Sequence, residues 1–192
     1  MPICKKSLLL SAVLLILLSF SFTFCAKASL TMWSQTYGEP TSSGARALVQ
    51  SLDGGYALAG SSGTDFWLIK TGPNGNPQWN QTYTGTDYET AYALVQTSDG
   101  GYAIAGSTGD PKGYHSDFWL VKTDPSGNME WNHAYGGPER ESAEAVIQTS
   151  DGGYAIAGYT DSFGAGLKDF WLCENRRERE HGVEPNIWRS RL

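Results

Sequence analysis

The chain has little cysteine, no excess of positive charge and no helical hydrophobic rhythm. Of its three cysteines, Cys4 and Cys25 lie near the N-terminus, which leaves Cys173 alone in the rest of the chain. A domain without a cysteine pair must rely on core packing instead of disulfides. The formal net charge of −6 argues against nucleic acid or an anionic membrane surface as a partner. The absence of a 3.6-residue apolar period disfavours a helical fold.

An apolar run without any charge occupies residues 7–24, directly after the basic pair Lys5-Lys6. Ala26-Lys27-Ala28 then supplies small residues in the pattern that a signal peptidase accepts. We therefore expect residues 1–28 to be an apolar signal helix, with the mature protein secreted or held at the cell surface. The run is also close to the minimum of about 18 residues that spans a bilayer, so an uncleaved membrane anchor is the alternative.

The rest of the chain is rich in glycine, tryptophan and tyrosine, and these residues recur in register. The recurring columns are the DGGYA segments from Asp53, Asp99 and Asp151, the DFWL segments from Asp65, Asp117 and Asp169, and the tryptophans Trp33, Trp79 and Trp131, each followed four residues later by tyrosine. Self-similarity with a period of about 50 residues is the signature of stacked repeat units.

Each unit has the pattern of four short strands. In the middle unit these are ALVQ, GYAIAG, DFWLVKT and MEWNHAY. The DGG turn between the first two contains glycines, which adopt the positive φ that a tight hairpin requires. The alanines of GYAIAG leave room for close packing of an adjacent sheet. DFWLVKT is apolar on both faces, as a strand sandwiched between two sheets must be.

These features predict an all-β fold, an incomplete β-propeller of about three four-stranded antiparallel blades. The units lie near 45–83, 91–135 and 143–172, and residues 32–37 are expected to form an additional N-terminal strand. The repeat region as a whole is 29–172. Three blades are fewer than the roughly 4–8 that form a ring, so we expect a fragment of a larger protein.

The repeats resemble those of large secreted and surface proteins of prokaryotes that carry DGGY and D-x-W-L-x-K-T-D signatures. The G-x-x-x-W motif, at Gly75 to Trp79 and Gly127 to Trp131, is also distantly similar to the tryptophan-docking turn of quinoprotein-type propellers. This resemblance covers Trp33 to Leu172 and implies the architecture. It transfers no cofactor, because the spacing between Asp124 and Gly127 is one residue shorter than in the quinoprotein pattern.

The segment 173–192 departs abruptly from the repeat. Codons can be chosen for it that, read one base out of frame, encode VKTDASGNMEWNQTYGGP. That sequence matches Val121 to Pro138 except at Pro125, His133 and Ala134. We interpret 173–192 as a frameshifted tail and expect it to be disordered, since its mixed charges were not selected to pack.

The recurring polar residues are expected to be structural, because a catalytic residue is needed once and a structural one in every repeat. We predict no catalytic residue, no metal ligand and no cofactor. The units differ chiefly in the loop between the second and third strands, where binding residues are expected. The candidate ligand-binding residues are Asp110, Lys112, Tyr114, His115, Asp161, Phe163 and Lys168.

Two function classes follow. The first is a non-catalytic exported repeat module that binds a protein or glycan at the cell surface through its loops. The alternative is a truncated propeller enzyme of the glycosidase or quinone-dependent dehydrogenase type. Propeller enzymes need non-repeating polar residues that converge at the ring centre, and the sequence offers almost none. Binding is therefore the favoured reading, with no nucleic acid as partner and with membrane contact only through an uncleaved N-terminal segment.

Overall fold

Eleven β-strands form three antiparallel sheets in a computed structural model that describes residues 32–38, 41–86, 88–110, 112 and 114–175. The first sheet contains β1 (Ser43–Gln50), β2 (Tyr56–Ser62), β3 (Asp65–Thr71) and β4 (Pro77–Tyr83). The second contains β5 (Tyr88–Gln96), β6 (Tyr102–Gly109), β7 (Ser116–Thr123) and β8 (Met129–Tyr135). The third contains β9 (Glu141–Gln148), β10 (Tyr154–Thr160) and β11 (Asp169–Asn175). No helix occurs among these described residues, so the all-β prediction is confirmed.

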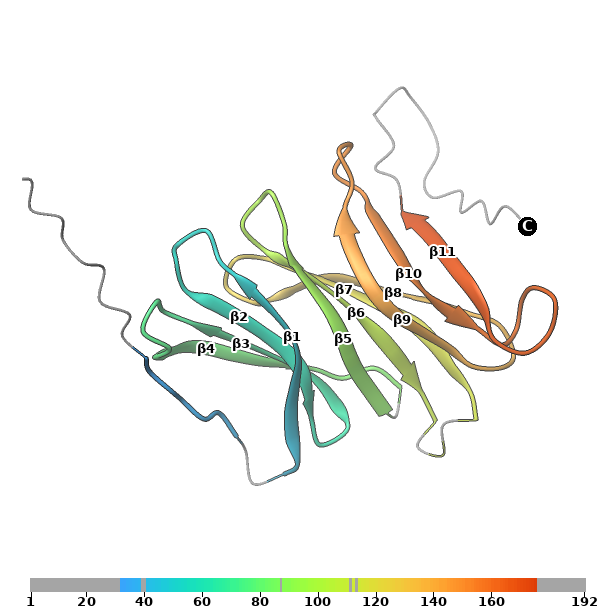
Figure 1. Ribbon diagram of the computed structural model, residues 1–192, viewed down its shortest axis with the longest axis horizontal. Helices are drawn as coiled ribbons and strands as arrows, with labels where there is room; N and C mark the ends of the chain where they lie inside the picture. The colour runs from blue at the N-terminus through green and yellow to red at the C-terminus, as the bar shows by residue number, and fades with distance from the viewer. Residues whose placement is uncertain (1–31, 39–40, 87, 111, 113, 176–192) are drawn as a thin grey trace, which may run out of the picture. The chain divides into compact units, whose positions relative to one another are not determined.

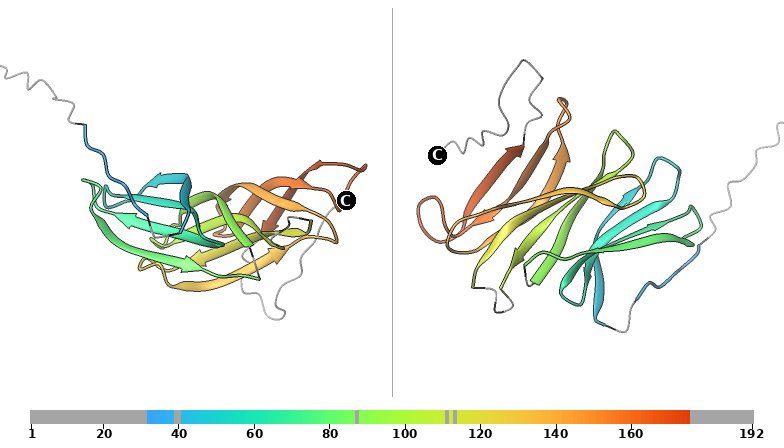
Figure 2. Two further views of the ribbon diagram at one scale, coloured as in Figure 1. Left: turned by 90° about the horizontal axis from the view of Figure 1, so that it is seen from below. Right: turned by 180° about the vertical axis from the view of Figure 1, so that it is seen from behind.

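Strand order within each sheet follows chain order, as expected for successive hairpins (Figure 1). The sheets follow one another in sequence in the other views as well (Figure 2). The DGG turns close the first hairpin of each sheet, and Gly54, Gly100 and Gly152 adopt φ of 81°, 87° and 85°. Residues that carry a Cβ atom rarely adopt this backbone conformation, which explains why glycine occupies these three positions.

Consecutive sheets pack on one another through clusters of buried apolar side chains. Between the first two sheets, Phe66 of β3 contacts Trp119 of β7, with ring centroids 4.5 Å apart. Between the second and third, Phe118 contacts Trp171 of β11 at 4.6 Å. Thus β7 presents alternate side chains to both neighbours and is buried on both faces, which confirms the two-faced character predicted for it.

The fourth strands of the first and second sheets, β4 and β8, dock on the sheet that follows. The Trp79 ring lies 5.9 Å from that of Tyr102, and the Tyr83 hydroxyl donates to the Gly127 carbonyl oxygen at 2.8 Å. Gly127 has φ of 82°, and a Cβ built on it would lie 2.6 Å from the Trp79 ring. Glycine in the G-x-x-x-W motif therefore makes room for the tryptophan of the preceding repeat.

The predicted strand at 32–37 does not form among the described residues, since residues 33–38 have no strand partner. A strand requires a neighbour, and the neighbour here would be the third strand of a preceding repeat. The side chains nevertheless dock as those of a fourth strand do. The Trp33 ring lies 5.9 Å from Tyr56, and the Tyr37 hydroxyl donates to the Gly75 carbonyl oxygen at 2.5 Å.

The expectation of disorder from residue 173 onward is wrong for its first three residues, because β11 continues to Asn175. Cys173 pairs with Ile156 and Asn175 with Tyr154, through backbone groups that do not depend on side-chain identity. Cys173 stands where the earlier repeats have Ile69 and Val121, and it packs against the buried apolar side chains between the second and third sheets. Residues 176–192 and the predicted signal segment 1–28 lie outside the described residues.

Candidate functional site

The DGG aspartates stabilise the turns in which they stand. In all three sheets the carboxylate accepts the backbone N–H two residues later, at 3.0–3.1 Å; the acceptors are Asp53, Asp99 and Asp151, and the donors Gly55, Gly101 and Gly153. Such an Asx turn fixes the hairpin locally. The structural role predicted for these aspartates is therefore confirmed.

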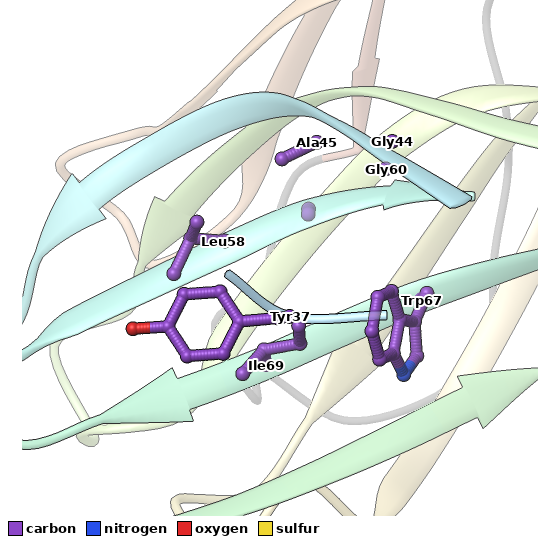
Figure 3. A pocket seen from close by; sticks show the side chains of 8 residues that line it. Tyr37, Gly44, Ala45, Leu58, Gly60, Trp67 and Ile69 are labelled. Carbon is purple, nitrogen blue, oxygen red and sulfur yellow. The ribbon is translucent and has the colours of Figure 1, made fainter. Parts of the chain in front are cut away.

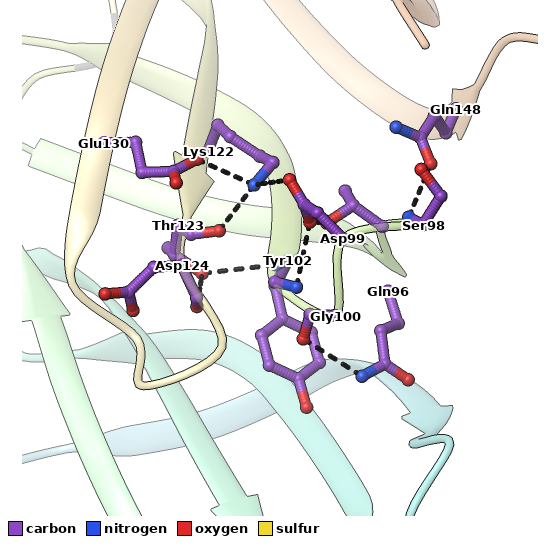
Figure 4. A network of polar contacts seen from close by, with 12 residues as sticks. Gln96, Ser98, Asp99, Gly100, Tyr102, Lys122, Thr123, Asp124, Glu130 and Gln148 are labelled. Carbon is purple, nitrogen blue, oxygen red and sulfur yellow. Dashed lines mark hydrogen bonds and ion pairs between the residues drawn. The ribbon is translucent and has the colours of Figure 1, made fainter.

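A buried lysine joins this turn to the third and fourth strands. Lys122 Nζ donates to the Asp99 carboxylate at 2.9 Å, to Glu130 at 2.8 Å and to the Thr123 carbonyl oxygen at 2.7 Å (Figure 4). Lys70 repeats the arrangement in the first sheet, with Asp53 at 2.7 Å. All three donor positions of the Lys122 ammonium are used, so the group has no proton donor left for a ligand.

The electrostatics of this cluster follow from its contacts. Burial alone would lower the pKa of Lys122, but the Glu130 and Asp99 carboxylates outweigh it and raise that pKa. Burial would raise the pKa of Asp99, but hydrogen bonds from Thr97, Lys122 and the Gly101 N–H lower it to about 2. Both groups are thus held in their charged forms near neutral pH. The cluster is suited to fixing strands, not to proton transfer.

The third sheet carries Glu174 where the other sheets carry Lys70 and Lys122. At this repeat position a carboxylate thus replaces an ammonium. We expect Glu174→Lys to raise the free energy of unfolding by about 1 kcal/mol, since the new ion pair is solvent-exposed. Urea denaturation measures this change.

Glu174→Gln is the matched control, because it removes the negative charge without supplying an ammonium. If the lysine variant is no more stable than the glutamine variant, the third sheet does not form the lysine cluster of its neighbours.

At the opposite end of the sheets, two buried glutamates hold the loops. Glu141 accepts from the Thr160 hydroxyl at 2.6 Å and from the backbone N–H groups of Gly137 at 2.9 Å and Ser162 at 3.2 Å. Glu89 accepts from the Thr108 hydroxyl at 2.9 Å in the second sheet. The sequence analysis missed both residues. A signal was present, because Glu89 and Glu141 each stand seven positions before the glutamine that ends the first strand of their sheet.

Asp117 lies beside Glu141, and the two carboxylates differ in proton affinity. Burial, with the nearby charge of Glu141, raises the pKa of Asp117. Burial would raise the pKa of Glu141 as well, but hydrogen bonds from Ser162, Thr160 and the Gly137 N–H outweigh it and lower that pKa. Gly136 lies against both carboxylates. A Cβ on Gly136 would lie 2.7 Å from an oxygen of Glu141 and would overlap the carboxylate of Asp117.

The predicted binding residues of the second sheet belong to a loop that Asp110 organises. Its carboxylate accepts the backbone N–H groups of Lys112 at 2.7 Å, Tyr114 at 3.1 Å and His115 at 2.7 Å. His115 Nδ1 lies 2.5 Å from the carbonyl oxygen of Pro138. Tyr114 is 67% exposed and is available to a ligand.

The predicted binding residues of the third sheet lie in the loop between β10 and β11. Phe163 packs on Trp171, with ring centroids 5.4 Å apart. Lys168 Nζ lies 3.7 Å above the ring centroid of Tyr159, a cation–π contact. The Asp161 backbone N–H donates to the Arg140 carbonyl oxygen at 2.8 Å.

Residues 136–140, which connect β8 to β9, bring the two loops together. On one side the Glu139 carbonyl oxygen accepts the Ser116 N–H at 3.2 Å, next to the contact of His115 with Pro138. On the other side the Glu139 N–H donates to the Ser162 hydroxyl at 2.9 Å. Residues 136–140 thus contact both loops. His115 and Asp161 contact this segment through its backbone, and the Phe163 ring lies 3.0 Å from where a Cβ on Gly137 would be. Lys168 contacts Tyr159 of its own sheet instead.

No cluster of three or more metal-binding side chains occurs in the part of the chain that the structure describes. In the same residues no helix is long and apolar enough to cross a membrane. Neither a family model nor a curated protein matches the chain.

Proposed function

We propose that the chain is a non-catalytic, exported repeat module that binds a protein or glycan at the cell surface through its inter-strand loops. One observation carries the proposal. The three repeats share their turns and their inter-sheet contacts, and the first two share a lysine cluster, whereas the repeats differ in the loops around Tyr114 and Lys168. Loops that vary on a repeated scaffold are where binding residues concentrate.

The proposed architecture is an incomplete β-propeller that belongs to a larger surface or adhesion protein. Its support is the recurrence of the same inter-sheet contacts at both interfaces, Phe66 on Trp119 and Phe118 on Trp171. Successive four-stranded antiparallel sheets packed face to face are the building principle of propellers. The leader-like segment 1–28 supports export.

The pair Asp117 and Glu141 is the observation that favours the alternative, a propeller enzyme of the glycosidase type. Two carboxylates of different proton affinity are the usual acid–base arrangement of glycosidases. We favour binding because Glu141 is buried and its oxygens accept three protein donors. The first and second sheets also repeat the pair as Asp65 and Glu89.

Binding of the fluorescently labelled chain to intact cells tests the proposal. Protease treatment of the cells abolishes binding if the partner is a protein, and periodate oxidation abolishes it if the partner is a glycan. We expect the double variant Tyr114→Ala with Lys168→Ala to bind at least about tenfold more weakly, since each lost contact contributes about 1 kcal/mol.

Leu52→Ala is the matched control, because Leu52 is an exposed apolar residue in the β1–β2 turn, at the other end of the sheets. Equal binding by the loop double variant and the unaltered chain would refute the loop site.

A further inference from the structure

The third sheet exposes an apolar face that its predecessors bury. Phe66 and Phe118 are completely buried against the next sheet, whereas Phe170, at the same repeat position, is 104% exposed. Leu172 of β11 and Ile147 of β9 are 71% and 60% exposed beside it. Contiguous exposed apolar residues on a sheet mark a contact surface. This face, formed by Phe170, Leu172 and Ile147, is here called the tail face.

The first sheet has the complementary hollow. Trp67 stands where Trp119 and Trp171 receive a phenylalanine, but no phenylalanine reaches it among the described residues. A hollow of about 50 Å³ lies there instead, lined by Tyr37, Ala45, Leu58, Gly60, Trp67 and Ile69 (Figure 3). We call it the head socket.

The second sheet shows what fills such a socket. Gly106 occupies the repeat position of Gly60, and the Phe66 ring lies 2.9 Å from where a Cβ on Gly106 would be. The glycine leaves space for the incoming phenylalanine. The residues that line the head socket are the repeat equivalents of those that cluster around Phe66, so an incoming Phe170 would meet the same kinds of side chain there.

The backbone edges are complementary as well. Among the described residues no fourth strand pairs with the edge of β11, whereas β3 and β7 pair with β4 and β8. The segment from Trp33 to Tyr37 reads WSQTY, against WNQTY in β4, and it has no strand partner among the described residues. Its side chains already dock on the first sheet as those of a fourth strand.

We propose that two copies of this chain associate head to tail. Phe170 of one copy enters the head socket of the other, and the segment from Trp33 to Tyr37 of that second copy pairs with β11. The register of β3 with β4, in which Phe66 opposes Tyr83 and Lys70 opposes Trp79, sets Phe170 opposite Tyr37. Two copies of three sheets give six, within the roughly 4–8 that close a propeller ring.

A second copy is the occupant because one chain carries both halves of the contact. The two interfaces within the chain show what each surface does. The tail face corresponds to the surface that supplies a phenylalanine, and the head socket corresponds to the surface that receives it. Such a contact is heterologous, since the two surfaces differ, and it closes only when both copies use both surfaces.

Light scattering after size exclusion tests the association on the full chain, with a mild detergent present to solvate residues 7–24. We expect a dimer for the unaltered chain and a monomer for Phe170→Asp and for Ala45→Asp, which places a charge in the socket. Both positions are exposed, so circular dichroism should show an unchanged fold. Leu52→Asp is the control and should remain dimeric.

Mixing the two monomeric variants decides the geometry. Phe170→Asp keeps an intact head socket and Ala45→Asp keeps an intact tail face, so together they should form a heterodimer through one interface. A monomeric unaltered chain, a ladder of larger species, a dimer that survives both substitutions, or a mixture that stays monomeric would each overturn the proposal. A dimer that survives both substitutions would point to the apolar N-terminal run instead.

Discussion

Replacing Phe118 with alanine should lower the free energy of unfolding by about 3–5 kcal/mol, the cost of deleting a large buried aromatic side chain. Phe118 is completely buried between the second and third sheets and packs on Trp171. Its apolar cluster includes the small side chains Ala103, Ala105 and Ala143, which cannot extend into the space that the ring would leave. Denaturation in guanidinium chloride measures the loss.

Phe170→Ala is an internal control with the same chemistry at the same repeat position. Phe170 is fully exposed, and its removal should change stability by no more than about 0.5 kcal/mol. The comparison is made at protein concentrations low enough to keep chains separate. Similar losses for the two variants would show that the inter-sheet layer does not hold the sheets together.

Gly127→Ala should lower the free energy of unfolding by about 2–4 kcal/mol. Part of this is the roughly 1–2 kcal/mol cost of a side chain at φ of 82°. The rest is overpacking, because the new Cβ would lie 2.6 Å from the Trp79 ring and 3.0 Å from Gln81. The tryptophan would have to leave its place on the following sheet.

Gly100→Ala separates the two contributions. Gly100 has φ of 87°, but a Cβ there meets only Pro125, at 3.5 Å. It should therefore lose only the backbone part. If Gly127→Ala is no more damaging than Gly100→Ala, as judged by thermal and chemical unfolding, tryptophan docking contributes nothing to stability.

The sequence was sufficient for the strands and turns, because these depend on local chemistry. The DGG turns need glycine at positive φ, and DFWL alternates apolar residues on both faces. Both signals recur in every unit, so each repeat supports the others. They predicted the four strands of the first and second sheets, whereas the third sheet has three strands among the described residues and residues 32–37 form none.

The pairing between units could not be read in the same way. A column of tryptophans does not say which neighbour receives each ring, and only the structure shows that Trp79 docks on the turn of Gly127. Glu141 escaped notice because a single glutamate beside a loop usually faces solvent. Its burial depends on backbone N–H groups from residues 137 and 162, which come from two different connections.

The end of β11 shows a further limit. Cys173, Glu174 and Asn175 do not follow the repeat, yet they continue the strand. Pairing with β10 uses backbone groups, and a thiol is small and apolar enough for the place of Ile69 or Val121. Burial, with the charge of Glu141, raises the pKa of Cys173 to about 12, so the thiol stays neutral there.

The direction of the Phe–Trp contacts has a consequence for the order in which the protein is made. Each phenylalanine is covered by a tryptophan one repeat later, as Phe66 is by Trp119. A ribosome, or an export channel that delivers the N-terminus first, therefore always releases a newest sheet whose phenylalanine is still bare. Each newly made sheet covers the phenylalanine of the sheet before it, and its own phenylalanine stays exposed until the next sheet is made.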